Sequence, residues 1–169
     1  KNSSRYIIGI GQSGIGLDPE YYTHPNEQQK AVVAAYKSLN NDLLKMVGNA
    51  PAVAEKKMEA AFALEDRIAK VSYDQVKSRD PQANYHPMTW EQLLKDYPGI
   101  DWNYLLRATG FPDNGGKVDV GQPEPVHEVE KILATAPLES LKAYMELAVV
   151  SSAAGMLSDN FTDRKFEYT

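Results

Sequence analysis

The feature that most constrains this sequence is a pair of long stretches, residues 26–48 and 51–77, in which apolar residues recur every three or four positions. The members are Val32, Ala35, Leu39, Leu43 and Met46, followed by Met58, Ala61, Leu64, Ile68 and Val71. This spacing places apolar side chains on one face of an α-helix. Gly48 stands where a helix C-cap is expected, and Pro51 suits the first turn of a new helix. The two stretches therefore predict an antiparallel helical hairpin.

The hairpin leads into residues 64–102, the most distinctive part of the chain. Arg79-Asp80-Pro81 should end the second long helix, because a residue before proline avoids the α conformation. Asp80 is expected to accept hydrogen bonds in this turn, a structural role. Thr89 and Gln92 have capping-box spacing, as do Asn26 and Gln29 earlier. A further short helix should begin at Asp101 and end at Gly110.

The remaining segments predict two more helices and one small ribbon. Helices are expected over residues 126–134 and from Pro137 onward. The second of these is apolar all round, which indicates a buried helix. Tyr6–Ile10 and Lys117–Val120 are strand-like and should pair with each other. The predicted fold is mainly α, a helical lobe built on long antiparallel helices with a two-stranded β ribbon, in one domain over residues 1–169.

Composition limits the classes of partner. The 169 residues are 43% hydrophobic and 24% charged, with a net charge of −5 and no cysteine. An acidic chain with interleaved charges is not expected to bind nucleic acid, and thiol chemistry is absent. No apolar run approaches the roughly 20 residues that a membrane helix needs. The chain begins at Lys1 without a signal peptide, and we interpret it as a fragment or a mature product.

No residue in the sequence is assigned a catalytic or metal-binding role, and no substrate-binding residue can be named. His24, His86 and His127 are scattered, and the HExxH pattern that begins at His127 has Lys131 in the second histidine position. Gly9–Gly14 matches GxGxxG, but no helix follows to bind a phosphate. Ser13 lacks a nucleophile elbow and an activating histidine.

Pairs of charged residues are candidate acid–base groups only if burial separates their pKa values. These pairs are Glu65-Asp66, Arg79-Asp80 and Asp159-Asp163.

Aromatic residues crowd the turns around residues 64–102: Tyr21, Tyr22, Tyr73, Tyr85, Trp90, Tyr97, Trp102 and Tyr104. Aromatic side chains of this kind usually hold loops onto helices. If they are exposed, they form a platform for a peptide or a carbohydrate instead.

With these motifs in order, the chain resembles the N-terminal, non-catalytic region of the neprilysin and endothelin-converting-enzyme family of zinc metallopeptidases, which includes bacterial oligopeptidases. Residues 12–17 and 20–22 are similar to its Q-x-G-L-G-L and Y-Y segment. Similar blocks continue to the end of the chain: Leu64-Glu65, Ile68-Ala69, Arg79-Asp80-Pro81, Tyr85, Met88-Thr89, Leu93, Pro98, Asp101-Trp102, Gln122-Pro123 and Phe166-Glu167-Tyr168. Two departures are the loop at residues 17–20, which lacks the family's arginine, and His86 in place of a common asparagine.

The resemblance implies a zinc endopeptidase for small peptides, in which this helical lobe faces a catalytic lobe of the same polypeptide. The family's zinc ligands and general base lie on HExxH and E-x-x-x-D motifs, expected beyond residue 169. The resemblance implies no zinc site in these residues, which would wall the cavity and restrict substrates to small peptides. It also implies an exported protein, periplasmic or extracellular, either free or anchored to a membrane upstream of these residues. The alternative hypothesis is a free-standing helical module that binds peptide or carbohydrate.

Overall fold

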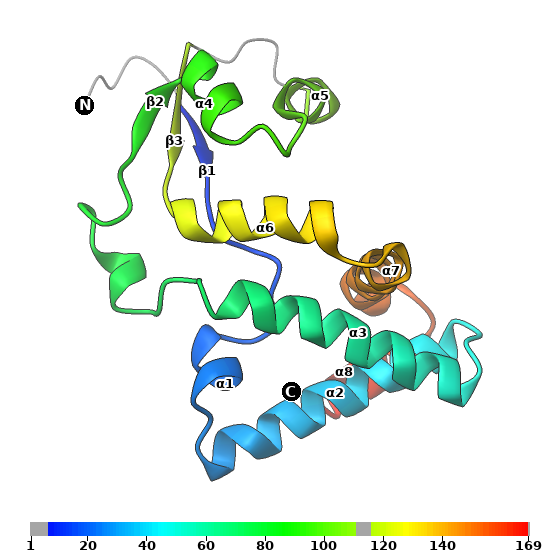
Figure 1. Cartoon of the computed structure of the whole chain (residues 1–169). Helices are drawn as coiled ribbons and strands as arrows, with labels where there is room; N and C mark the ends of the chain where they lie inside the picture. The colour runs from blue at the N-terminus through cyan, green and yellow to red at the C-terminus, as the bar shows by residue number, and fades with distance from the viewer. Residues whose placement is uncertain (1–6, 111–115, 169) are drawn as a thin grey trace. The chain divides into compact units, whose positions relative to one another are not determined.

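The computed structural model describes residues 7–110 and 116–168 (Figure 1). Within these ranges the fold is mainly α-helical, as predicted, with eight α-helices and one small sheet. The chain divides into two compact units, Lys1–Gly14 with Val71–Thr135 and Ile15–Lys70 with Ala136–Thr169. The single domain expected over residues 1–169 stays a prediction.

The unit formed by Ile15–Lys70 and Ala136–Thr169, the helical unit, contains helices alone among its described residues. They are α1 (Pro19–Thr23), α2 (Glu27–Met46), α3 (Pro51–Ala69), α7 (Leu138–Ala153) and α8 (Asp159–Phe166), with a 3-10 turn at Ala154–Met156. The short helices α1 and α8 were not predicted.

The predicted hairpin is formed by α2 and α3. The capping box of α2 is complete, because Asn26 accepts from the Gln29 amide at 2.9 Å and the Gln29 side chain accepts from the Asn26 amide at 2.9 Å. After α2, Gly48 has φ +101°, a conformation that favours glycine. Helix α3 then runs back along α2, and Lys37 and Glu59 form an ion pair of 2.9 Å between them.

Helix α3 is shorter than predicted. It ends at Ala69, whereas the sequence indicated a helix to about residue 77. The reason lies at Tyr73, whose backbone N–H donates to the Gln12 side-chain oxygen at 2.7 Å instead of to the preceding helical turn. A long-range hydrogen bond therefore replaces the helical one.

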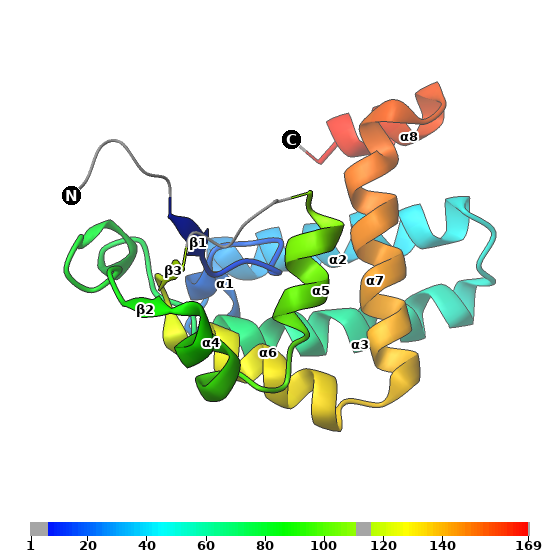
Figure 2. The ribbon, with the colours of Figure 1, turned by 90° about the horizontal axis from the view of Figure 1, so that it is seen from above.

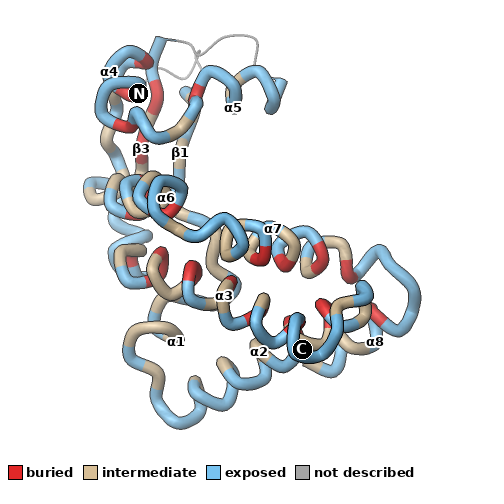
Figure 3. The backbone as a smooth tube through the Cα atoms, turned by 45° about the vertical axis from the view of Figure 1, so that its right-hand side comes forward, coloured by how far each residue is buried: buried red, intermediate tan, exposed pale blue. Residues whose placement is uncertain are grey.

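The core of the helical unit lies where α7 packs across α2 and α3 (Figure 2). Two buried clusters form it: Leu39, Leu43, Val150, Ala154 and Phe161, and Leu44, Ala54, Met58, Ala61 and Leu147. The predicted inner face of α3 is correct from Met58 to Ile68. The prediction of a fully buried α7 is wrong, because only Ala143, Leu147 and Val150 are buried, on the side that packs on α2 and α3, and much of the helix is exposed (Figure 3).

The other unit, the sheet unit, contains a three-stranded mixed sheet in the order β1-β3-β2. Its elements are β1 (Ile8–Ile10), a 3-10 turn (Lys77–Arg79), β2 (Pro87–Thr89), α4 (Trp90–Asp96), α5 (Trp102–Ala108), β3 (Lys117–Val120) and α6 (Pro123–Thr135). The predicted pairing of β1 with β3 is correct and parallel, with Ile8 opposite Val118. The two-stranded ribbon is a wrong prediction, since β2 also pairs with β3, antiparallel, with Met88 opposite Val118.

Side-chain caps begin both short helices of the sheet unit where the sequence predicted them. The Thr89 hydroxyl accepts from the Gln92 amide at 3.2 Å, and Asp101 accepts from the Tyr104 amide at 2.9 Å. These helices cover a buried cluster that the sheet shares: Trp90, Leu93, Tyr97, Trp102, Val118, Val120 and Val126. Helix α6 begins at Pro123, three residues before the predicted start.

Candidate functional site

The helical unit buries one carboxylate, Glu65 on α3, which is 6% exposed. The Tyr22 hydroxyl on α1 donates to it at 2.6 Å, and the Tyr36 hydroxyl on α2 donates at 2.9 Å. The Tyr22 oxygen in turn accepts from the backbone amides of Gly16 and Leu17, both at 3.2 Å. This network, the Glu65 network, joins three helices and the end of the glycine-rich loop.

Burial dominates the titration of the Glu65 network. It raises the pKa of Glu65 above its usual range, although the two tyrosine hydrogen bonds favour the ionised form and oppose the shift. Burial and the bond to Glu65 raise the pKa of Tyr22 and of Tyr36. Both phenols therefore stay protonated near neutral pH and act as donors.

Gly16 lies close against the Tyr36 ring, which would have to move for a larger residue. A Cβ built at this position would be 2.0 Å from the Tyr36 hydroxyl oxygen and 2.4 Å from Cζ. Gly16, within the motif at residues 12–17, thus allows the loop to approach the ring of Tyr36, whose hydroxyl donates to Glu65.

The sheet unit contains a second network, centred on Gln12. Its side-chain amide donates to the Tyr73 carbonyl at 2.9 Å and accepts from the Tyr73 amide at 2.7 Å. The Gln12 backbone amide donates to the Gln122 side chain at 2.7 Å. The Gln12 side chain therefore pairs with both the backbone carbonyl and the backbone amide of Tyr73, which is 61 positions away in the sequence.

The Gln12 network continues to the turn at residues 77–84. Gln122 donates to Asn84, and the Asn84 amide donates to the carbonyls of Lys77 and Asp80, both at 2.7 Å. The Asp80 carboxylate accepts from the Gln82 amide at 2.8 Å. The predicted turn role of Asp80 is therefore confirmed, and Arg79 lies exposed in the adjacent 3-10 turn.

Tyr73 adds a charged contact to the same unit. Its hydroxyl donates to Glu124 at 2.8 Å, and the Lys77 ammonium lies 3.5 Å from the centre of its ring. Burial and the neighbouring carboxylate raise the pKa of Tyr73 to about 12. The phenol is thus a structural donor at neutral pH.

An open groove of about 310 Å³ runs beside the glycine-rich loop in the sheet unit. Ile10–Gly14 form one side, so Ser13 lines it, and Ile100, Trp102 and Val126 contribute apolar side chains. Gly14 has φ +89° at the end of this stretch. The groove offers apolar surface and backbone polar groups, and no titratable side chain lines it.

The residues present do not fit a zinc site. Within residues 7–110 and 116–168, no group of three or more His, Cys, Asp or Glu side chains is arranged to hold a metal ion. His86 Nδ1 lies 3.0 Å from the Val120 carbonyl oxygen, in the position that departs from the family pattern. His127 stacks on Tyr97 with 4.4 Å between ring centres and contacts Glu130, while His24 follows α1.

The other candidate acid–base residues have surface positions. Asp66 forms an ion pair of 2.6 Å with Lys70, one helical turn away. Asp159 and Asp163 are exposed on α8. Glu65 is thus the one carboxylate among these candidates that is buried.

Half of the eight crowded aromatic residues are buried, and Tyr21 and Tyr22 are half-buried. Tyr73, Trp90, Tyr97 and Trp102 belong to the core, and the Trp102 indole donates to the Tyr97 carbonyl at 2.9 Å. Tyr85 and Tyr104 are exposed. The aromatic residues therefore serve mainly to pack turns onto helices, as expected.

Sequence reasoning identified the motif residues but not that they contact one another. Gln12 and Gln122 are 110 positions apart, and Tyr22 and Glu65 are 43 apart. The sequence indicated these contacts only indirectly, because Gln12, Tyr22 and Glu65 lie in the segments that resemble the family's motifs. Their use in two separate networks could be seen only in the folded chain.

Comparison with known proteins identifies the class of this chain, the N-terminal region of metallopeptidases. The model of the N-terminal part of "Peptidase family M13" matches residues 1–169. The chain belongs to peptidase family M13.

Several relatives agree with this membership. Mouse endothelin-converting enzyme-like 1 is 32% identical, over 99% of this chain and 22% of its own. Human endothelin-converting enzyme 1 is 27% identical, over 96% of this chain and 22% of its own. The structure of *Mycobacterium tuberculosis* zinc metalloprotease Zmp1 in the open state is 30% identical with a TM-score of 0.89, over 97% of this chain and 26% of that one.

The chain spans about a fifth of the length of the curated relatives it matches. Within the ranges that the structure describes, none of the helices has the length and apolar character needed to cross a bilayer.

Proposed function

We propose that this chain is the non-catalytic helical lobe of an M13 zinc endopeptidase. In this proposal it forms part of the wall of the substrate cavity and restricts cleavage to small peptides. The catalytic lobe of the same polypeptide supplies the chemistry, and the lobe described here excludes water and positions the peptide.

The observation that supports the proposal is that the side chains of the motif residues form hydrogen bonds within the chain. Gln12, Tyr22 and Glu65 direct their polar groups at the backbone or at each other. Side chains engaged in this way hold loops in position and are not available to activate a nucleophile. The region that matches the family therefore supports a scaffold role, and we assign the zinc site to residues outside this chain.

Zinc content and peptide hydrolysis test the proposal. The purified 169-residue chain should hold no stoichiometric zinc by elemental mass spectrometry and should not hydrolyse a fluorogenic peptide. The complete natural polypeptide should hold one zinc ion and cleave short peptides in preference to folded proteins. One tightly held zinc ion in each 169-residue chain would overturn the assignment.

A free-standing binding module is the second candidate, and the groove beside Gly11–Gly14 is the observation in its favour. The two candidates differ in the encoding gene. A reading frame that continues past Thr169 to an HExxH motif supports the peptidase, whereas a stop codon at that point supports the module.

The proposal also covers the cellular location of the enzyme. The resemblance to exported bacterial oligopeptidases supports an exported enzyme, periplasmic or extracellular. Cell fractionation with antibodies against this chain checks it, and recovery of the complete polypeptide only from the cytosol would contradict it.

A further inference from the structure

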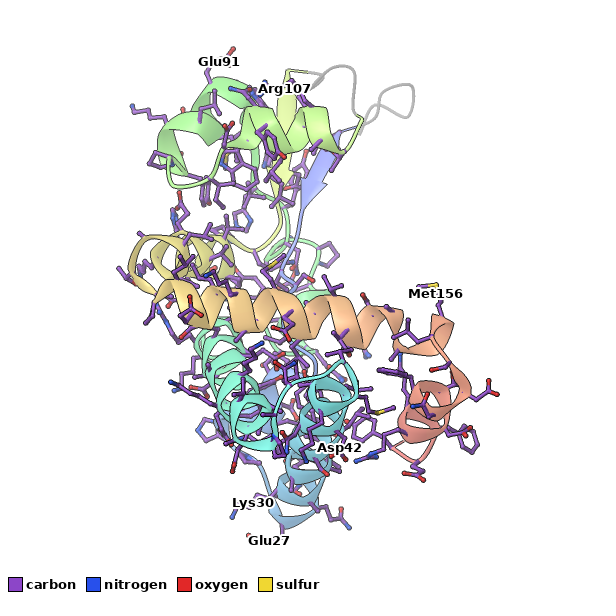
Figure 4. All side chains as sticks on the ribbon, turned by 90° about the vertical axis from the view of Figure 1, so that its right-hand side faces the viewer. Glu27, Lys30, Asp42, Glu91, Arg107 and Met156 are labelled. Atoms are coloured by element: carbon purple, nitrogen blue, oxygen red, sulfur yellow. The ribbon has the colours of Figure 1, made fainter. Side chains whose placement is uncertain are left out.

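One face of α7, here called the α7 outer face, is apolar and exposed. Leu138 is 64% exposed, Met145 59%, Val149 60% and Met156, in the turn after the helix, 83%. Met156 projects outward at the end of this segment (Figure 4). Ser152, between these positions, donates its hydroxyl to the Val149 carbonyl of its own helix at 2.9 Å. From Met145 to Met156 the face therefore presents mainly apolar side chains, whereas nearer the start of α7 the exposed Lys142 forms an ion pair of 2.8 Å with Glu139.

The composition of α7 sets it apart from its neighbour in the same unit. Residues 147–158 contain no charged side chain. The exposed positions of α3, in contrast, include Glu55, Lys56 and Glu59. A helix with one face on a core normally has a polar outer face, whereas a helix that is apolar all round is covered on every side. From Leu147 onward, α7 has the sequence of a covered helix, whereas Glu139, Lys142 and Glu146 lie before this point.

The rotation of α7 is fixed, so the outer face cannot turn into the core of the helical unit. Ala143, Leu147 and Val150 already fill the inner face. Beside them, the Glu146 carboxylate accepts from Lys57 at 2.5 Å and from Asn49 at 2.8 Å. Turning the helix would break this ion pair and expose the buried residues.

We propose that the α7 outer face is the docking surface for the part of the same M13 polypeptide that lies outside residues 1–169. This inference rests on the proposed function. The *Mycobacterium tuberculosis* relative contains this fold as 26% of its chain, with a TM-score of 0.89. The remaining three quarters of such a chain must pack somewhere, and a covalently linked segment has a high effective concentration.

The chemistry of the face specifies the occupant. Residues 147–158, which contain no charged side chain, match a segment that also presents apolar side chains. Methionines at two of its positions adapt to an irregular partner surface, because their side chains are unbranched and flexible. The occupant is therefore an apolar segment of the linked chain.

Oxidation of methionine reports directly on this surface. The 169-residue chain and the complete natural polypeptide are treated with hydrogen peroxide, and each methionine is followed by peptide mass spectrometry. Met145 and Met156 should oxidise rapidly in the short chain and on the order of tenfold more slowly in the complete polypeptide, because exposure governs the rate. Met58, buried on α3, should react slowly in both and serves as the control.

The outcomes separate this proposal from the proposed function. A complete polypeptide that hydrolyses peptides but leaves Met145 as reactive as in the short chain overturns the docking surface alone. A gene that ends at Thr169 overturns both. Protection of Met145 that appears in the short chain as its concentration rises, with a dimer seen by light scattering, shows that a second copy covers the face and overturns the linked occupant.

A charge placed on the face gives a second test. Val149→Glu should leave the melting temperature of the 169-residue chain nearly unchanged, because the side chain is exposed. The same change should lower the melting temperature of the complete polypeptide by several degrees, because an unpaired carboxylate is then buried. Val53→Glu, at an exposed valine on α3, is the matched control and should have little effect in either protein. Equal effects of Val149→Glu in both proteins would contradict the proposal.

Discussion

At the scale of the residue, Glu65 shows how a buried carboxylate is accommodated. Water is removed from around it, and the hydroxyls of Tyr22 and Tyr36 take the place of that water. Hydrogen bonds to a charged acceptor contribute about 1.5–3 kcal/mol each, more than neutral ones. The two phenols, whose pKa values are raised, keep their protons and so remain donors.

The Tyr22 hydroxyl has the most demanding role in this network, because it donates to Glu65 and accepts from two loop amides. Tyr22→Phe removes all three contacts and should lower the free energy of unfolding by about 1–3 kcal/mol. Urea denaturation measures this free energy. Tyr104→Phe, at an exposed tyrosine, is the control and should change the free energy of unfolding by less than about 0.5 kcal/mol. Equal stabilities of the two variants would contradict the network.

Gly16 provides a test of close packing. In Gly16→Ala the new methyl group would overlap the Tyr36 ring, so the ring must move and weaken its bond to Glu65. We expect a loss of about 1–3 kcal/mol in the free energy of unfolding, the usual cost of overpacking. Gly9→Ala is the matched control, since a Cβ there meets nothing within 4 Å. A Gly16→Ala variant as stable as Gly9→Ala would show that the loop is free to shift.

At the scale of the element, local patterns predicted what local forces determine. The capping box at Asn26 and the cap at Asp101 begin helices where expected, because their hydrogen bonds lie within four residues. The end of α3 and the strand Pro87–Thr89 depend on partners far along the chain, namely Gln12 and β3. No periodicity within a short window contains that information.

In the candidate site, too, the sequence predicts what local contacts determine and does not predict what distant partners determine. Glu65 could be noted from the sequence as a carboxylate within a motif, but its burial depends on α1 and α2 folding over α3. The face of α7 gives the opposite case. Its sequence predicted burial, whereas the structure exposes it, because burial of an apolar face depends on what packs against it and not on the sequence of the helix alone.

The turn at residues 77–84 is an element whose stability can be tested directly. Asp80→Ala removes the acceptor for the Gln82 amide and should cost about 1 kcal/mol, which lowers the melting temperature by roughly 2–4 °C in a chain of this length. Thermal unfolding followed by circular dichroism measures the shift. Asp80→Asn keeps the acceptor and should restore most of it. An unchanged melting temperature, together with lost activity in the complete enzyme, would show that Asp80 is functional rather than structural.

At the scale of the whole molecule, each unit has a hydrophobic core and a polar network of its own. The sheet unit is held by neutral amides around Gln12 and by the bond from Tyr73 to Glu124, and the helical unit relies on ionisable groups such as Glu65 and Glu146. In the helical unit, two carboxylates with pKa values shifted in opposite directions should make opposite contributions to the dependence of stability on pH.

The signs follow from proton binding. Hydrogen bonds from Lys57 and Asn49 lower the pKa of Glu146, so its stabilising contribution is present above the unfolded value of about 4.3 and is lost as the pH falls through the folded value. Burial raises the pKa of Glu65. Between about 4.3 and its folded pKa the native state holds more protons than the unfolded state, so this group makes stability fall as the pH rises.

Two variants separate these contributions when unfolding by urea is measured from pH 3 to 8. The free energy of unfolding of Glu65→Gln, relative to the unmodified chain, should increase as the pH rises from about 4 toward 7, because the glutamine carries no charge that burial penalises. The deficit of Glu146→Gln should instead be largest at neutral pH and should shrink as the pH falls below about 4.3 and through the lowered folded pKa of Glu146, where the unmodified chain also loses the ionised group. Parallel profiles for Glu65→Gln and the unmodified chain would mean that Glu65 titrates like a solvated carboxylate and that burial in the Glu65 network does not govern its ionisation.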